Sequence, residues 1–200
     1  METYRFTRQW VLDEVIKDTC TILYIHETGW CTVRLLPFTD SKGDVVIARP
    51  IAFHRRYGYW LGLCRQTGFG RPCLFCQMNT TRAFSRPLHK YAVNIKNLYE
   101  RVKGCRWVHI AIVPPPVFDQ ISDYLLQGHL DAIDYRRGRR FFIQHTGHGT
   151  QGRYSVEVSE WAIPVDKWTV NHIQDPLVAL KVPSYKSQQD TLKELFSCIR

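Results

Sequence analysis

The segment RRGRRFFIQHTGHGTQGRYSVEV, residues 136–158, carries much of the information about the fold. Two runs rich in β-branched and aromatic residues, Phe141–His145 and Tyr154–Val158, flank a glycine-rich stretch at 146–152. Runs of this kind separated by turn residues predict two strands joined as a hairpin with a long loop. Four arginines lie directly before the first run, so a strongly basic segment leads into the predicted hairpin.

The segments upstream predict more strands and one helix. WVHIAIV at 107–113 is typical of a buried strand, and the three prolines at 114–116 end it. VFDQISDYLLQ at 117–127 spaces its apolar residues at helical intervals, and Gly128 closes the helix.

Shorter runs near the N-terminus also predict strands. CTILYI at 20–25 and CTVRLL at 31–36 are separated by the turn-like HETGW, and 45–48 predicts a further short strand. Glycines and a proline make 54–76 irregular.

Several short strands, one helix and long loops favour a mainly β protein, and we expect an OB-type Greek-key barrel. Sandwiches and other small barrels fit this pattern nearly as well. A short C-terminal helix is expected from Gln188 to Cys198, with Ser187 as its N-cap.

Composition excludes several classes of protein. The chain has 200 residues, of which 44% are hydrophobic and 22% charged, so wholesale disorder is excluded. Its apolar runs are too short for a membrane span, so no membrane partner is expected. The count of seven cysteines is odd and no export signal is visible, so reduced thiols and a cytoplasmic location are expected.

The net charge of +9 is concentrated in one segment. Between Asp44 and Glu100 there are nine lysines and arginines and no acidic residue, while the rest of the chain balances at 18 basic and 18 acidic residues. The same segment is dense in aromatic residues. Cations that follow a phosphate backbone, interleaved with rings on which bases stack, are what binding of single-stranded nucleic acid requires.

A cluster of metal-ligand residue types lies inside this basic segment. Thiolates and an imidazole favour tetrahedral zinc, and a C-x-x-C turn offers two sulfurs to one ion. With four protein ligands no open position remains, so we expect one structural zinc ion. The expected ligands are His54, Cys64, Cys73 and Cys76, with His89 as a rival fourth ligand and Cys105 as a weaker one.

These residues resemble the single-stranded-DNA-binding, helix-destabilising proteins of T-even-like phages, which carry His…Cys…Cys-x-x-Cys in that order within an OB fold. CTVRLLPFTD at 31–40 is similar to the strand that precedes the family's zinc insert, and KYAVNI at 90–95 to the strand that follows it. FDQISDYL, RRFFIQHTGHG and YSVEVSEWAIP, within 118–164, resemble the family's helix and final barrel strands.

The resemblance implies an OB-fold DNA-binding core at 1–165 that includes a zinc-binding insert at 49–90, followed by a C-terminal extension at 166–200. It implies association with further copies along the strand and with replication or recombination proteins, in the host cytoplasm if the chain is phage-encoded. The last 35 residues carry five basic and four acidic side chains, where the family carries an acidic tail.

The expected function is therefore non-enzymatic: sequence-tolerant binding that coats and protects exposed single strands in replication, recombination or repair. Basic side chains would line a groove and aromatic rings would stack on bases. The candidate DNA-binding residues are Arg49, Arg55, Arg56, Tyr57, Tyr59, Trp60, Arg65, Arg71, Lys90, Tyr91, Trp107, Arg136, Arg137, Arg139, Arg140 and Phe141.

Two alternatives stay open at this point. One is a zinc-stabilised DNA-processing nuclease, for which an acidic cluster around the predicted helix could hold a catalytic metal. Its residues would be Asp119, Asp123, Asp131 and Asp134. The other is a zinc interaction module that binds RNA or protein.

Overall fold

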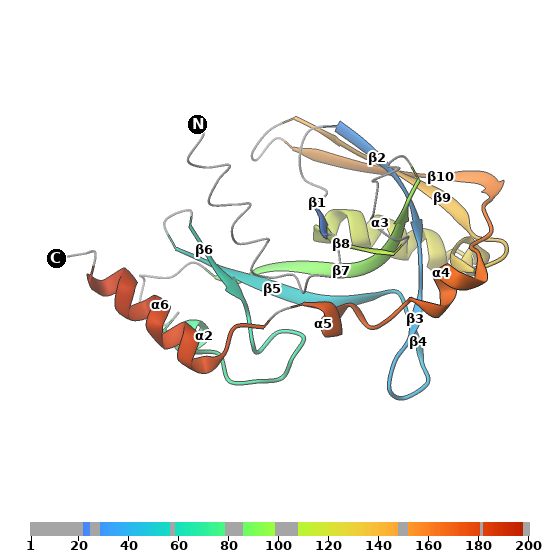
Figure 1. The fold of residues 1–200 in the computed structure, drawn as a ribbon. Helices are drawn as coiled ribbons and strands as arrows, with labels where there is room; N and C mark the ends of the chain where they lie inside the picture. Colours follow the sequence, from blue (N-terminus) through green and yellow to red (C-terminus); the bar gives the residue numbers. More distant parts are fainter. Residues whose placement is uncertain are drawn as a thin grey trace. The chain divides into compact units, whose positions relative to one another are not determined.

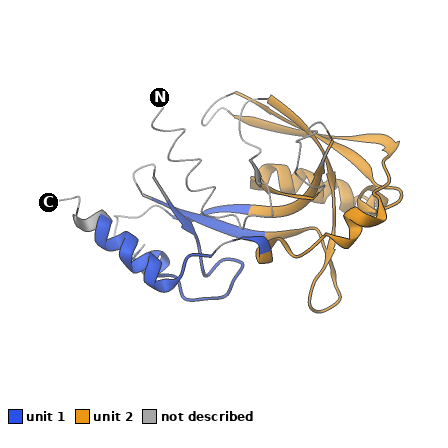
Figure 2. Cartoon of the chain, in the orientation of Figure 1, with its two compact units in different colours: residues 1–19, 50–90, 179–200 blue, residues 20–49, 91–178 orange. Residues whose placement is uncertain are grey.

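The computed structural model describes residues 22–24, 29–56, 59–78, 86–98, 108–147, 152–180 and 182–197. The protein is mainly β, with antiparallel strands and a few helices (Figure 1). It divides into two compact units (Figure 2). Unit 1 comprises residues 1–19, 50–90 and 179–200, and unit 2 comprises residues 20–49 and 91–178.

The strands are β1 (Ile22–Tyr24), β2 (Gly29–Leu35), β3 (Phe38–Thr39), β4 (Val45–Val46), β5 (Ala48–Arg56), β6 (Tyr59–Leu63), β7 (Leu88–Asn97), β8 (His109–Val113), β9 (Arg139–Thr146) and β10 (Arg153–Ala162). The helices are α2 (Leu74–Met78), α3 (Pro115–Leu126), the 3₁₀-helix η1 (Leu130–Ile133), α4 (Lys167–Asn171), α5 (Pro176–Ala179) and α6 (Tyr185–Ser197). None of the helices described here has the length and apolar character needed to cross a bilayer.

The sheet of unit 2 follows the order β1-β8-β7-β2-β9-β10. All of these neighbours are antiparallel except β1 and β8, which are parallel. The hairpin expected at 141–158 is present as β9 and β10, because directly opposed residues such as Phe141 and Val158 are paired along it.

Helix α3 packs its apolar stripe against the sheet of unit 2. Val117, Ile121 and Leu125 are buried in the same cluster as Phe141 and Ile143 of β9. The helix therefore covers the inward row of β9 side chains, and alternation along the strand directs the intervening residues to the opposite face of the sheet. The strand–proline–helix order expected for 107–128 is confirmed over its described part, since β8 is buried throughout and α3 follows Pro114.

The strands expected at 20–25 and 31–36 are present, over their described part, as β1 and β2. They do not pair with each other, because β1 pairs with β8 while β2 pairs with β7 and β9. One expectation is wrong. The segment 54–76 is more regular than its glycines indicate, since it contains the end of β5, all of β6 and most of α2. Gly62 serves as a strand residue opposite His54 in the β5–β6 hairpin.

The expected C-terminal helix is α6. It begins three residues before the expected start, so Ser187 is not its N-cap. Instead the Ser184 hydroxyl accepts a hydrogen bond from the Ser187 backbone N–H at 2.9 Å, which is the usual N-cap interaction. The C-terminal extension expected at 166–200 is also divided, because 166–178 belongs to unit 2 and 179–200 to unit 1.

Candidate metal centre and sheet-face site

A cluster of one histidine and three cysteines lies in unit 1. Its four ligand atoms all lie within 4.8 Å of one another, so the cluster could hold one metal ion such as zinc. Its members are His54, Cys64, Cys73 and Cys76. The structure thus brings together the four ligands expected from the sequence, whereas the rival His89 is exposed on β7 and Cys105 lies outside the described residues.

The β5–β6 hairpin supplies two of these side chains. His54 is paired with Gly62, and the Cys64 N–H donates to the Ala52 carbonyl at 2.7 Å. Residues two apart on a strand share a face, so this register places His54 and Cys64 on the same face of the hairpin.

The C-x-x-C motif supplies the other two. Cys73 directly precedes α2 and Cys76 lies in its first turn, where a separation of three residues brings both sulfurs to one side. The Gln77 N–H donates to the Cys73 carbonyl at 3.2 Å, which closes this first turn. The three-residue spacing of the C-x-x-C motif is therefore sufficient to place the two thiols side by side.

The distances between donor atoms fit a single tetrahedral ion. The Cys73 Sγ lies 3.3 Å and the Cys76 Sγ 3.5 Å from the His54 Nε2, and the Cys64 and Cys76 sulfurs are 3.4 Å apart. Zn–S bonds of about 2.3 Å and Zn–N bonds of about 2.0 Å would place donor atoms roughly 3.5 to 3.8 Å apart. A disulfide would need about 2.05 Å, so these cysteines are free thiols.

Electrostatics within the cluster favour one thiolate and penalise the others. The hydrogen bond from Cys64, followed by one from His54, lowers the pKa of the Cys73 thiol far below its usual range. The same contact with Cys73, together with burial, raises the pKa of Cys64, and burial raises that of Cys76. A divalent cation would stabilise all three sulfurs as thiolates, which is the form that binds metal.

The predicted DNA-binding residues of unit 1 fall into several environments. Arg71 is exposed, Arg55 and Lys90 are half-buried, and the guanidinium of Arg65 lies 5.8 Å from the centre of the Tyr185 ring. Four other predicted DNA-binding residues lie, in whole or in part, outside the residues that the structure describes. They are Tyr57 and the side chains of Arg56, Tyr59 and Trp60.

Unit 2 holds the rest of the predicted DNA-binding residues. The side chains of Arg136, Arg137 and Arg140 are exposed. Arg139 instead contacts Asp131 at 2.8 Å and the Tyr124 hydroxyl at 3.1 Å.

Arg49 of unit 2 is held by carboxylates. It lies 2.9 Å from an oxygen of Asp175 and 3.6 Å from one of Asp40, and the contact with Asp175 raises its pKa. The exposed arginines are therefore the better candidates for contact with phosphate.

One predicted stacking ring is corrected by its burial. Phe141 has an exposed fraction of 0% and belongs to the core of unit 2, so neither of its faces is free for a base. Tyr91 stacks on Phe118 with ring centres 4.0 Å apart and packs against the same core. Trp107 lies outside the described residues.

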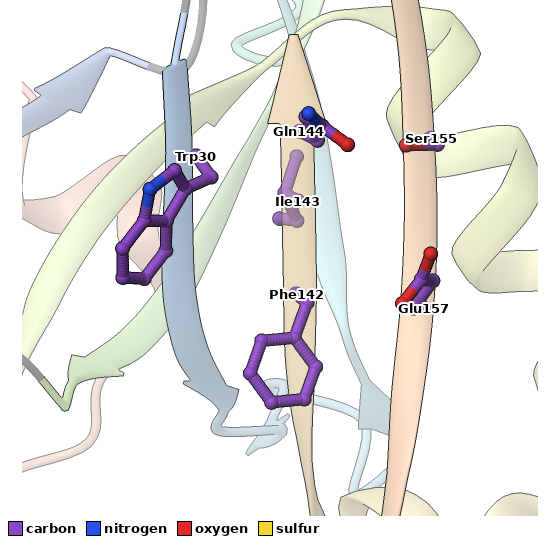
Figure 3. A pocket seen from close by; sticks show the side chains of 6 residues that line it. All are labelled: Trp30, Phe142, Ile143, Gln144, Ser155 and Glu157. Atoms are coloured by element: carbon purple, nitrogen blue, oxygen red, sulfur yellow. The ribbon is translucent and has the colours of Figure 1, made fainter.

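The structure shows two aromatic residues that the sequence did not reveal. Trp30 of β2 is 64% exposed, and Phe142 of β9 lies on the same sheet face, because Trp30 pairs with Gln144, two residues along β9. A shallow hollow of about 250 Å³ is lined by Trp30, Phe142, Ile143, Gln144, Ser155 and Glu157 (Figure 3). Alternation along 139–146 indicates that Phe142 faces away from the core. The turn-like HETGW at 26–30 carries no signal that Trp30 lies on a strand.

We call this surface the outer sheet face of β2, β9 and β10. In addition to the lining side chains, it carries Arg140 at one end, two residues before Phe142, and Arg153 at the other end, opposite Thr146. Both arginines are exposed. The face therefore combines exposed aromatic surface with cations at both ends and one carboxylate, that of Glu157.

The turn before β9 carries two more exposed cations, three and four residues before Arg140. The Asp134 Oδ1 accepts hydrogen bonds from the backbone N–H groups of Arg136 and Arg137, each at 2.8 Å. These hydrogen bonds to backbone N–H groups stabilise the turn. Both guanidinium groups remain exposed. The bond from Arg137, followed by that from Arg136, lowers the pKa of the Asp134 carboxyl, which therefore stays ionised at neutral pH.

The comparisons with known proteins do not identify a family. No protein-family model matches the chain, and no curated protein matches it.

Proposed function

We propose that the protein binds single-stranded DNA without catalysis and without strong sequence preference, as the resemblance to the T-even-like phage proteins implies. The observation that carries the proposal is the outer sheet face, where the exposed Trp30 and the half-buried Phe142 lie between cations. Rings and cations on one exposed face provide stacking for bases and charge for phosphates. An OB-type barrel is the fold we propose for unit 2.

The placement of charge supports phosphate contact at one end of this face. Arg136 and Arg137 are exposed on the turn, and Arg140 begins the row that leads to Phe142. A single DNA strand that lies along β9 would contact guanidinium groups at one end and aromatic side chains further along. Contacts of this kind are made to the backbone and to the faces of bases, so they carry little sequence information.

Two of the four acidic residues of the nuclease alternative have other partners. Asp131 contacts Arg139, and Asp134 holds the turn before β9. Among the residues that the structure describes, only the histidine–cysteine cluster groups three or more potential metal ligands. The nuclease alternative therefore lacks an observation in its favour.

For the metal centre we propose one structural zinc ion held by His54, Cys64, Cys73 and Cys76. Three sulfurs and one imidazole are a donor set typical of structural zinc, and four protein ligands complete its tetrahedral coordination. Bound zinc would cross-link the β5–β6 hairpin to α2. Zinc content of the purified protein, measured by mass spectrometry, tests this assignment.

The DNA proposal is tested by fluorescence anisotropy with labelled oligo-dT, the matched duplex and the matched RNA, each at low and high salt. We expect preference for the single strand and weaker binding at high salt, since log K falls with a slope of about −0.7 per neutralised phosphate. Equal affinity for duplex would overturn the proposal. Tighter binding of the RNA would reassign the protein as an RNA-binding module.

The outer sheet face is tested with two tryptophan variants. Trp30→Ala should weaken oligo-dT binding by about 1–3 kcal/mol, the usual contribution of one stacked base. The matched control is Trp168→Ala, which removes a partly exposed tryptophan from α4. If both variants bind DNA equally well, the outer sheet face is not the stacking surface.

A further inference from the structure

Helix α6 places a buried glutamine against the metal cluster. Gln188 has no exposed surface, although it lies on a C-terminal helix whose other polar residues are mostly exposed. Its Nε2 donates to the Cys73 Sγ at 3.4 Å, and its Oε1 accepts from the Leu74 backbone N–H at 3.0 Å. One side chain thus contacts both a metal-ligand sulfur and the backbone N–H of the residue that follows it.

The apolar surroundings of Gln188 make these two bonds important. Leu192, one helical turn further along α6, is buried in one cluster with Cys64, Cys73 and Phe75. A polar group in such a place is costly unless it is hydrogen-bonded. Both of these side-chain hydrogen bonds go to the metal-binding segment, so that segment satisfies the buried amide.

A second contact ties the same helix to the loop between two ligands. Arg65, which directly follows Cys64, lies with its guanidinium 5.8 Å from the ring centre of Tyr185, the first residue of α6. The backbone N–H of Thr67 in this loop donates to the Cys64 Sγ at 3.4 Å. Helix α6 therefore contacts the metal-binding segment at Cys73, through Gln188, and at Arg65, the residue next to Cys64.

We propose that α6 is part of the metal centre, with Gln188 as a positioning residue for Cys73, and that metal binding and the docking of α6 are coupled. An N–H group aimed at a sulfur favours the thiolate that binds metal, and such outer hydrogen bonds fix the orientation of ligands. Coupling is reciprocal: if docked α6 strengthens metal binding, bound metal strengthens the docking of α6. This inference requires a metal in the cluster and is independent of DNA binding.

Two variants of the full-length protein test the role of Gln188. Gln188→Ala removes both hydrogen bonds, while Gln189→Ala changes the same residue type at the adjacent, exposed position of the helix. The readout is Co²⁺ affinity, measured from the thiolate-to-metal absorption band in competition with a chelator. We expect a 10- to 100-fold loss of affinity for Gln188→Ala, as for other outer-shell partners, and no loss for Gln189→Ala.

Hydrogen exchange on the unmutated protein tests the coupling and does not depend on how the variants fold. Amides of 185–197 should exchange faster after the metal is removed and regain protection when Zn²⁺ is restored. Unchanged exchange in α6, or Gln188→Ala with the Co²⁺ affinity of the unmutated protein, would overturn the proposal. Because oligonucleotide binding is measured separately, failure of the DNA proposal would leave this result intact.

Discussion

Arg34 is a charged side chain with no exposed surface, held in the interior of unit 2 by backbone carbonyls. It donates to Leu35 O at 2.7 Å, Ala132 O at 3.1 Å and Ile163 O at 3.2 Å, and also to the carbonyl of Asp134. Burial lowers its pKa to about 10, so it remains protonated at neutral pH. This one residue links β2 to the segments before β9 and after β10.

Gly138 makes room for that guanidinium, which leads to the first prediction. A Cβ at Gly138 would lie 1.6 Å from the Arg34 Nη2, and the backbone of Gly138 is not in the left-handed region, so space is the reason for glycine here. Gly138→Ala should therefore displace Arg34 from its carbonyls. We expect a loss of more than about 2 kcal/mol in the free energy of unfolding, measured by urea denaturation.

The control is Arg137→Ala, which changes the preceding exposed residue of the same turn. Its effect should stay within about 0.5 kcal/mol, as is usual for surface substitutions. A Gly138→Ala protein as stable as this control would show that Arg34 can move aside at little cost.

Cys31 gives a second prediction at this scale, on thiol reactivity. Burial raises the pKa of its free thiol to about 11. Because the thiolate is the nucleophile, Cys31 should resist iodoacetamide in the native protein at pH 7.5, and its labelling rate should rise steeply toward pH 10. Peptide mass spectrometry measures this directly, with urea-unfolded protein as the fully labelled reference. Rapid native labelling at pH 7.5 would contradict the burial argument.

The sequence predicted the position of some functional residues and not of others. His54 and the three cysteines could be grouped because thiols and an imidazole have few other reasons to gather in a segment rich in glycine and proline. Phe141 and Phe142 are adjacent and chemically identical, so only the register of β9 decides which ring is buried. That register depends on pairing with the neighbouring β10 and with β2, which lies about a hundred residues away in the sequence.

Helix α4 begins at an N-cap whose charge can be tested. The Asp166 carboxylate accepts from the Thr169 N–H at 2.8 Å and from its hydroxyl at 2.7 Å, and it lies 3.1 Å from the Lys96 Nζ. The contacts with Thr169, followed by Lys96, lower the pKa of Asp166 far below its usual range. At neutral pH this carboxylate therefore stabilises the start of the helix.

The third prediction concerns the pH dependence of this cap. Because the folded pKa is depressed, the stabilisation is present above the unfolded pKa of about 3.9 and is lost as pH falls below it. Asp166→Ala should cost about 1 kcal/mol at pH 7, the usual value of an N-cap, and the difference should shrink below about pH 4. Thermal unfolding of both proteins across this range is the measurement. A difference that does not change with pH would show that the carboxylate charge has no role.

Elements defined by local signals were predicted well, and those defined by partners were not. The hairpin at 141–158 and the helix after Pro114 follow from alternation, periodicity and proline. By contrast, two neighbouring runs at 20–36 carry the same signals as a hairpin, yet β1 joins β8 in parallel some ninety residues away. Neither run contains a local signal for this pairing, because the partner of β1 is set by which strand lies at the edge of the sheet.

At the scale of the whole molecule, the chain leaves one compact unit and later returns to it. Unit 1 combines 50–90 with 179–200, so the final helix belongs with the metal cluster, although more than a hundred residues separate Cys76 from Gln188. Charge and motif analysis treat the C-terminal segment as a separate extension, because the apolar face of α6 does not indicate what it packs against. The long-range contacts of Gln188 and Leu192 supply that information.

This division leads to the last prediction, on removal of the metal from the full-length protein. All four ligands lie in unit 1, whereas the core of unit 2 is built from apolar residues of β2, β7, β8, β9 and α3. A short ligand hairpin has little core of its own, so its ordering should depend on the metal, while the sheet of unit 2 should not. Chelation should therefore remove hydrogen-exchange protection from 51–56 and 59–78 and leave that of 139–146 and 153–162 unchanged. Equal loss of protection in both sets would show that the two units unfold together, and no loss in either would show that the cluster needs no metal to fold.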